Sequence, residues 1–167
     1  MAKEKASIGL AGEFFVLAEL FRRGYQASLT FGNTKKIDIF AESPNGKTIK
    51  IQVKTTSKFP KNKIHSKWQV GRKTWEISPE EQENLYFIFV LLNEPPEAPI
   101  YHIAKAKDVI EQTKESFKKW SDEIESGKIK YRGGLTKKER EDYNMKDFYS
   151  EQFEKKYSFI DWDQMFD

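Results

Sequence analysis

The sequence predicts an α/β protein with a central mixed β-sheet flanked by helices. Helical and strand patterns alternate along residues 7–120, and a hairpin pattern lies between Lys35 and Ser57. The apolar run 85–92 has the length of a central strand that is covered on both faces. The 167 residues are most simply one domain, with 1–120 as its core and 121–167 as a polar, acidic and aromatic extension docked on that core.

Composition restricts the class of protein. The chain is polar, with a mean hydropathy of -0.76, but 14% aromatic residues argue against wholesale disorder. It has no cysteine, which excludes disulfides and thiolate metal sites and fits a reducing compartment. The longest apolar run is too short to span a bilayer and the N-terminus lacks a signal-peptide pattern, so we expect a cytoplasmic protein without membrane contact.

Charge is segregated along the chain, although the formal net charge is only +3. Between Glu42 and Glu76 there is no acidic residue, whereas acidic residues prevail from Glu141 onward. The acidic tail also carries many aromatic residues, so we expect it to dock on the core. Its carboxylates either lie over a basic groove or form a solvated outer face.

The hairpin has a turn at Pro44-Asn45-Gly46 that suits a three-residue loop with Gly46 in the left-handed conformation. This loop length puts the apolar residues of both strands on one face, whereas a two-residue turn would mix the faces. The cross-strand pairs predicted in this way are Ser43–Lys47, Ala41–Ile49, Ile39–Ile51 and Ile37–Val53.

The same register predicts a polar patch on the other face of the hairpin. Asp38 lies opposite Gln52, and Lys36 lies opposite Lys54. Like charges directly across a strand pair are destabilising, so a neighbouring anion, either a protein carboxylate or a bound phosphate, would stabilise the two lysines. The alternative interpretation is a solvated sheet face without chemistry.

Residues from about Ser7 to Arg23 predict an amphipathic helix that ends at Gly24. Glu13 lies on an apolar flank of this helix, where a carboxylate needs a partner unless it emerges at a solvated rim. The apolar stripe expected for this helix consists of Leu10, Phe14, Leu17 and Phe21, broadened by Ala11, Phe15 and Ala18.

Basic residues interleaved with aromatic ones follow the hairpin. Basic side chains supply contacts to nucleic-acid phosphates, and flat aromatic rings either stack on bases or pack in a core. We expect core packing for Trp68 and Trp75. The nucleic-acid contacts predicted in and beside this segment are Lys36, Lys58, Lys61, Lys63, Lys67, Arg72 and Lys73.

Further elements are predicted downstream. Ser78-Pro79 begins a short helix, 100–103 is a strand, and 105–120 is a helix.

Four short motifs follow one another in the first third of the chain: Gly12-Glu13, Gly32-Asn33-Thr34, Ile37-Asp38 and Gln52-Val53-Lys54-Thr55. In order and spacing they resemble the PD-(D/E)xK, or restriction-endonuclease-like, nuclease superfamily in its Gln-x-Lys form, and a prokaryotic group within it. The resemblance implies a restriction-endonuclease-like fold and an endonuclease that hydrolyses DNA phosphodiester bonds with Mg²⁺ or Mn²⁺.

The resemblance also implies roles for individual residues. Glu13, Asp38, Gln52 and Lys54 are the catalytic candidates, and Glu13, Asp38, Gln52 and Val53 are the candidates for holding the metal. Carboxylate and amide oxygens suit a hard cation, which activates water and neutralises charge on the phosphate. Lys54 can orient that water or stabilise the transition state.

The chain departs from the pattern of the superfamily at two positions. Gln52 stands where an acid is more usual and contributes no negative charge, and Ile37 stands in place of the proline. These departures favour an alternative from another class, a catalytically weak or inactive nuclease-fold module that binds nucleic acid or a protein partner. A homodimer is plausible because two active sites cut both strands most easily. No glycine-rich phosphate loop is present, so no nucleotide cofactor is expected.

Overall fold

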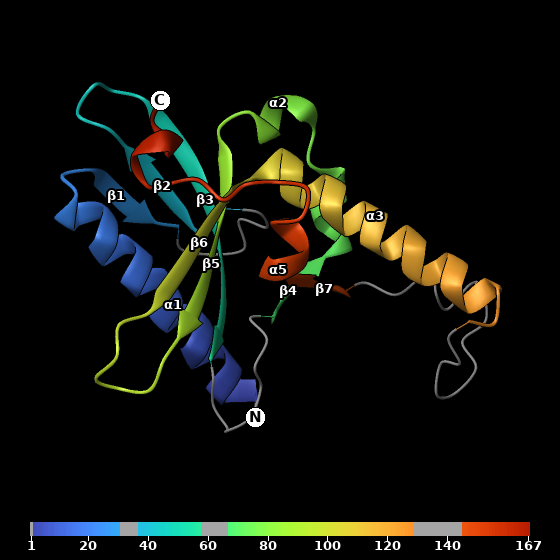
Figure 1. The fold of residues 1–167 in the computed structure, drawn as a ribbon. Coiled ribbons are helices and arrows are strands. Elements are labelled where there is room, and N and C mark those ends of the chain that lie inside the picture. Colours follow the sequence, from blue (N-terminus) through green and yellow to red (C-terminus); the bar gives the residue numbers. More distant parts are fainter. Residues whose placement is uncertain (1, 31–36, 58–66, 129–144) are drawn as a thin grey trace.

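The structure, a computed structural model, describes residues 2–30, 37–57, 67–128 and 145–167. Its main sheet has the strand order β1-β2-β3-β5-β6, in which β3 and β5 are parallel and the other neighbours are antiparallel (Figure 1). The predicted α/β class with a mixed sheet flanked by helices is therefore confirmed. The five strands are β1 Gln26–Leu29, β2 Ile39–Glu42, β3 Thr48–Ser57, β5 Leu85–Leu92 and β6 Ile100–Lys105.

Helices cover both faces of this sheet, α1 on one side and α3 on the other (Figure 1). A separate two-stranded ribbon, β4 with β7, lies on the α3 side. Within the described ranges, no helix is both long and apolar enough to cross a membrane. The remaining elements are α1 Ala2–Arg22, β4 Lys67–Gly71, the 3₁₀ helix η1 Arg72–Glu76, α2 Pro79–Gln82, α3 Ala106–Glu125, β7 Met145–Tyr149, α5 Ser150–Phe153 and the 3₁₀ helix η2 Asp163–Met165.

The central strand β5 separates two apolar cores. Phe87 and Phe89 pack on the α3 side, whereas Ile88 and Val90 pack on the α1 side. Successive side chains of a strand point to opposite faces, so a strand with both faces covered is apolar at every position. The interpretation of the apolar run as a covered central strand is therefore confirmed.

The hairpin of β2 and β3 has the predicted loop and register. Ile39 pairs with Ile51 and Ala41 with Ile49, and these four side chains are buried in the core beneath α1. Gly46 has a φ of 79°, the left-handed conformation that the loop requires. The turn chemistry and the hydrophobic alternation thus agree on one register.

Leu17 of the apolar stripe predicted for α1 packs against the core, but for Leu10, Phe14 and Phe21 the prediction was wrong. Leu10, Phe14 and Phe21 are 49%, 52% and 54% exposed, whereas Val16 and Leu20 are fully buried against the sheet. The buried, sheet-facing row of α1 is Gly12, Val16 and Leu20, which also lie at helical spacing. Small residues let the helix approach the sheet closely, so the side with the bulkier residues is turned outward.

Two aromatic residues of the basic segment lie as expected. Trp68 is buried on β4, and its indole N–H donates to the carbonyl of Val90 at 2.9 Å. Trp75 is partly buried against the same core. The predicted cap of α2 is also present, because Ser78 and Glu81 form a reciprocal capping box with Pro79 in the first turn.

C-terminal residues pack against both apolar cores, one on each face of the sheet. Phe148 on β7 stacks on Phe89 with ring centroids 4.0 Å apart. Further on, the chain reaches the end of α1 and β1, where Phe166 stacks on Tyr25 at 4.1 Å and the Tyr25 hydroxyl donates to Asp163 at 2.7 Å. Both Asp163, which accepts this hydrogen bond, and Asp161 are exposed, so these carboxylates remain at the surface.

Candidate active site

Regular pairing of β2 with β3 ends at Ile39. The backbone N–H of Asp38 donates to the carbonyl of Ile51 at 2.9 Å, although Ile51 is already the partner of Ile39. Two consecutive residues thus face one residue, which is the geometry of a β-bulge. The ladder does not continue to the predicted pairs Asp38–Gln52 and Ile37–Val53, because the bulge turns the start of β2 away from β3.

The side chain of Asp38 occupies the gap left by this separation. Its Oδ2 accepts the backbone N–H of Val53 at 2.7 Å, a bond that a carbonyl of β2 would otherwise accept. The other oxygen, Oδ1, accepts no hydrogen bond from the residues that the structure describes. One carboxylate oxygen is therefore fixed against β3, and the second is left for another ligand.

Glu13 and Lys54 complete a group of three charges with Asp38. Burial, followed by the negative charge of Asp38, raises the pKa of Glu13 above its ordinary value, and Lys54 opposes this shift. Burial also raises the pKa of Asp38, opposed by the Val53 N–H and by Lys54. Burial lowers the pKa of Lys54, opposed by the two carboxylates. The three side chains, from α1, the start of β2 and β3, therefore lie within electrostatic reach of one another.

Gln52 lies on the same face of β3 as Lys54, two residues earlier. It is 8% exposed, and its Oε1 atom is buried without a hydrogen-bond partner among the described residues. Leaving a buried acceptor unsatisfied costs about 1–3 kcal/mol. A buried oxygen of this kind is a natural ligand for a cation.

Val53 contributes differently from its neighbours. Its side chain is 7% exposed and packs in the core beneath α1, so it is not chemically active. In an antiparallel pairing the N–H and the carbonyl of one residue point to the same side, and the Val53 N–H already points to Asp38. The Val53 carbonyl therefore points toward the gap between β2 and β3.

The donor set of this site fits a hard cation such as Mg²⁺ or Mn²⁺. Glu13 and Asp38 supply carboxylate oxygens, Gln52 supplies an orphaned amide oxygen, and the Val53 carbonyl faces the same gap. Oxygen ligands of these types are the ones that Mg²⁺ uses in proteins. Within the described part of the chain, no group of three or more His, Cys, Asp or Glu side chains is placed to hold a metal. The candidate site has two carboxylates, and its third side chain is the amide of Gln52.

The predicted nucleic-acid contacts divide into three groups. Lys36, Lys58, Lys61 and Lys63 lie outside the described residues. Lys67 forms an ion pair with Asp147 at 2.6 Å, and the Arg72 guanidinium lies over the rings of Trp75 and Phe117 at 4.8 Å and 4.7 Å. Lys73 is exposed. The structure thus gives Lys67 and Arg72 protein partners and leaves Lys73 at the surface.

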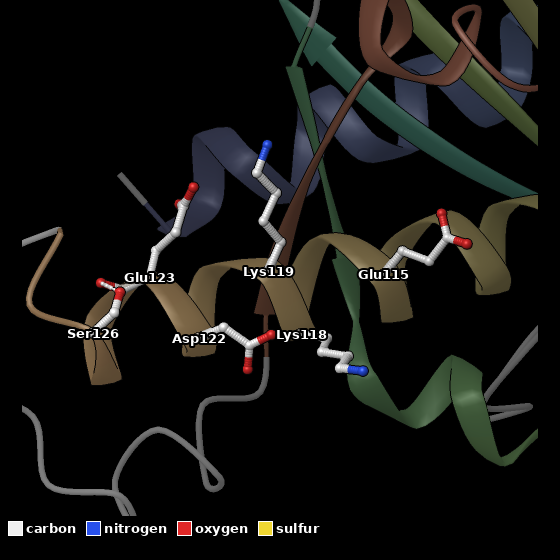
Figure 2. A pocket seen from close by; sticks show the side chains of 6 residues that line it. All are labelled: Glu115, Lys118, Lys119, Asp122, Glu123 and Ser126. Atoms are coloured by element: carbon white, nitrogen blue, oxygen red, sulfur yellow. Dashed lines mark hydrogen bonds between the residues drawn. The ribbon is translucent and has the colours of Figure 1, made fainter.

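One shallow pocket lies on α3, well outside this group of residues (Figure 2). All of its lining residues lie between the middle of that single helix and its C-cap, and they carry charges of both signs. Side chains from one helix face do not converge on a common point, so this pocket carries no evident chemistry. Its lining consists of Glu115, Lys118, Lys119, Asp122, Glu123 and Ser126.

Sequence reasoning missed three features of the site. The bulge at Asp38 and the bond from Val53 to its carboxylate depend on where pairing stops, which no local pattern indicates. The orphaned oxygen of Gln52 depends on burial by strands that are distant in sequence. The close approach of Gly12 to Thr55 had a visible signal, because a glycine inside a helix is costly and usually has a packing reason.

Comparison with protein-family models, curated proteins and solved structures found no match. The function of this site is therefore inferred from its own geometry and chemistry.

Proposed function

We propose that the protein is a metal-dependent endonuclease that hydrolyses DNA phosphodiester bonds, with a site of the PD-(D/E)xK, restriction-endonuclease-like, type in its Gln-x-Lys form. The observation that carries the proposal is the Asp38 carboxylate, fixed by the Val53 N–H at the point where β2 leaves β3. Lys54 lowers the pKa of this carboxyl, Asp38 in turn raises the pKa of Glu13, and Gln52 adds a buried oxygen without a partner among the described residues.

Glu13, Asp38, Gln52 and the Val53 carbonyl would hold Mg²⁺ or Mn²⁺, which supplies a Lewis acid for the phosphate and lowers the pKa of bound water. The Val53 N–H fixes the orientation of Asp38, so this ligand needs no rearrangement when the cation binds. Preorganisation of this kind reduces the cost of binding.

In this proposal Lys54 acts on the reacting phosphate. The two carboxylates favour its protonated form, while burial lowers its pKa. A protonated ammonium in a partly buried site stabilises negative charge on a phosphate oxygen more strongly than it would in water. Lys54 therefore has the charge and the surroundings required of a group that stabilises the transition state.

The amide of Gln52 reduces the negative charge of the ligand set relative to a site with three acids. Metal affinity depends on the number of charged ligands, so we expect weaker metal binding than a three-acid site would have. This feature favours the second candidate function, a module that binds nucleic acid or a protein partner without cleaving DNA.

A homodimer and a cytoplasmic location remain predictions from the sequence.

The deciding experiment is cleavage of supercoiled plasmid and of a single-stranded circle with Mg²⁺ or Mn²⁺. Wild type is compared with Lys54→Ala, and Lys50→Ala is the control, because Lys50 lies on the same strand and the same face as Lys54. We expect cleavage by wild type and by Lys50→Ala, and a loss of at least about 100-fold in Lys54→Ala.

Other outcomes would redirect the proposal. Equal cleavage by wild type and Lys54→Ala would mean that a contaminating nuclease or another site is responsible. No cleavage by any of the proteins, together with metal-independent shifts of DNA in gels and no Mn²⁺ binding by calorimetry, would establish the non-catalytic module.

A further inference from the structure

Helix α1 makes its closest approach to β3 at Gly12. A Cβ atom added at this glycine would lie 1.9 Å from the Thr55 Oγ1, 2.8 Å from its Cγ2 and 2.9 Å from its Cβ. Side-chain carbons in proteins essentially never come this close to another heavy atom. Rotation of the Thr55 side chain would move Oγ1 and Cγ2 but not Cβ, so an alanine at position 12 has to push the helix away from the strand.

We infer that Gly12 is a positioning residue for Glu13: its lack of a side chain lets α1 lie against Thr55 and so keeps the adjacent carboxylate within electrostatic reach of Asp38 and Lys54. The inference rests on the proposed function in one respect, the role of Glu13 as a metal ligand. The contact itself is independent of any activity.

The row of residues that faces the sheet supports this role. Its buried members are Gly12, Val16 and Leu20, so the side chains increase from hydrogen to branched groups in the direction of the C-terminal end. The Thr55 hydroxyl also donates to the carbonyl of Gly9, at 3.5 Å. Thr55 therefore contacts α1 on the turn that precedes Glu13.

This arrangement explains why a helix interior contains a residue that disfavours helix. Glycine costs about 1 kcal/mol relative to alanine at such a position. A helix is stiff, so a shift of its backbone at residue 12 moves the carboxylate of residue 13 by a similar distance. Misplacement of a functional group by about 1 Å can reduce activity by a factor on the order of 100.

The test compares two glycines on the same helix. Gly12→Ala introduces the clash, whereas a Cβ at Gly9 would meet nothing within 4 Å, so Gly9→Ala is the matched control. Both variants gain the same helix propensity. We expect Gly12→Ala to weaken Mn²⁺ binding at least tenfold in titration calorimetry while its circular dichroism remains that of the folded protein, and we expect Gly9→Ala to bind Mn²⁺ like wild type.

A second substitution tests the cause. Thr55→Gly removes Oγ1, Cγ2 and Cβ, the three atoms nearest to the added carbon. We expect Gly12→Ala/Thr55→Gly to recover most of the lost Mn²⁺ affinity, and Thr55→Gly alone to change it less than threefold. Unchanged binding in Gly12→Ala, or no recovery in a folded double variant, would overturn the inference.

A readout without metal separates this inference from the proposed function. The Val53 amide donates to Asp38, so its NMR resonance responds to a displacement of the neighbouring Glu13 charge. We expect this resonance to move in Gly12→Ala, to return toward its original position in the double variant and to stay in Gly9→Ala. If wild type binds no Mn²⁺, the proposed function fails, and the Val53 resonance alone decides whether Gly12 positions Glu13.

Discussion

The carboxylate of Asp38 and the backbone N–H of Val53 are joined by a hydrogen bond of 2.7 Å across a pair of strands that has already separated. A side chain thus replaces a backbone carbonyl at the end of a ladder. This replacement satisfies a buried N–H and at the same time holds a charged group at the opening of the sheet, within electrostatic reach of Lys54 and Glu13. This one hydrogen bond therefore both ends the strand pairing and orients the carboxylate of the candidate site.

Stability should depend on pH through Glu13. Burial and Asp38 raise its folded-state pKa above 4.5, so the native state holds this proton more tightly than the unfolded chain does. The resulting stabilisation is fully present below pH 4.5 and is lost as the pH rises through the folded-state pKa. Glu13→Gln does not titrate. We expect its melting temperature, measured by calorimetry against wild type, to become relatively higher as the pH rises from 4 to 7.

The control for this experiment is Glu19→Gln on the same helix. Glu19 forms ion pairs with Arg22 at 2.7 Å and Arg23 at 3.3 Å, so its loss should lower stability at pH 7 by about 0.3–1 kcal/mol. The two variants are therefore expected to change stability in opposite directions at pH 7. A lower melting temperature in Glu13→Gln than in wild type at pH 7 would show that the folded protein does not disfavour the ionised form of Glu13.

The orientation of α1 can be tested with one substitution at two positions. Leu20 is fully buried against the sheet, whereas Leu10 is 49% exposed. Leu20→Ala should cost about 2–5 kcal/mol of unfolding free energy, and Leu10→Ala less than about 1 kcal/mol. Urea denaturation of both variants measures the difference. Equal losses would mean that Leu10 faces a core as the sequence pattern suggested.

The hairpin register could be predicted from the sequence because the turn residues and the alternation of apolar and polar residues both act locally. Pro44-Asn45-Gly46 sets the loop length, and the pairing of Ile39 with Ile51 follows from it. The face of α1 could not be obtained in this way, since two apolar rows compete on that helix. The choice between them depends on Thr55, which lies 43 residues from Gly12 (55 − 12) and excludes a side chain there.

The candidate site, too, could be predicted from the sequence only in part. The chain order of Glu13, Asp38 and Lys54 indicated that a helix and a hairpin bring them together, and their mutual effects on pKa agree with this. The bulge at Asp38 was not predicted, because continued pairing satisfies the local pattern equally well. The Val53 N–H donates to the Asp38 side chain and not to a backbone carbonyl of the neighbouring strand. Which of these two acceptors it uses is visible only in the folded structure.

Arg72 and its neighbour Lys73 should behave differently when truncated. The guanidinium of Arg72 lies over two aromatic rings, so Arg72→Ala should lower stability by about 1 kcal/mol. Lys73 is exposed, and Lys73→Ala should stay within about 0.5 kcal/mol of wild type. If the surface around η1 binds DNA, Lys73→Ala should also reduce the salt dependence of binding. Thermal unfolding and binding at two salt concentrations measure both effects, and a loss of stability in Lys73→Ala alone would contradict the structure.

Gln52 offers a test in which stability and metal binding change in opposite directions. Gln52→Leu keeps a similar volume but removes the buried Oε1 that lacks a partner. The variant should gain about 1 kcal/mol of stability, because an unsatisfied buried acceptor is lost. It should also bind Mn²⁺ at least tenfold more weakly, since one oxygen ligand has been removed. Urea denaturation and calorimetry on the same samples measure the two changes.

Gln112→Leu is the matched control for this variant. Gln112 on α3 is also buried and its Oε1 also lacks a partner among the described residues, although its amide N–H donates to Ser116 at 3.1 Å. Its replacement should leave Mn²⁺ binding unchanged, because α3 contributes nothing to the group of Glu13, Asp38 and Lys54. A loss of Mn²⁺ affinity in Gln52→Leu alone would assign the orphaned oxygen to the metal. Equal affinities in wild type and Gln52→Leu would leave that oxygen as a purely structural defect and reduce the ligand set to the two carboxylates and the Val53 carbonyl.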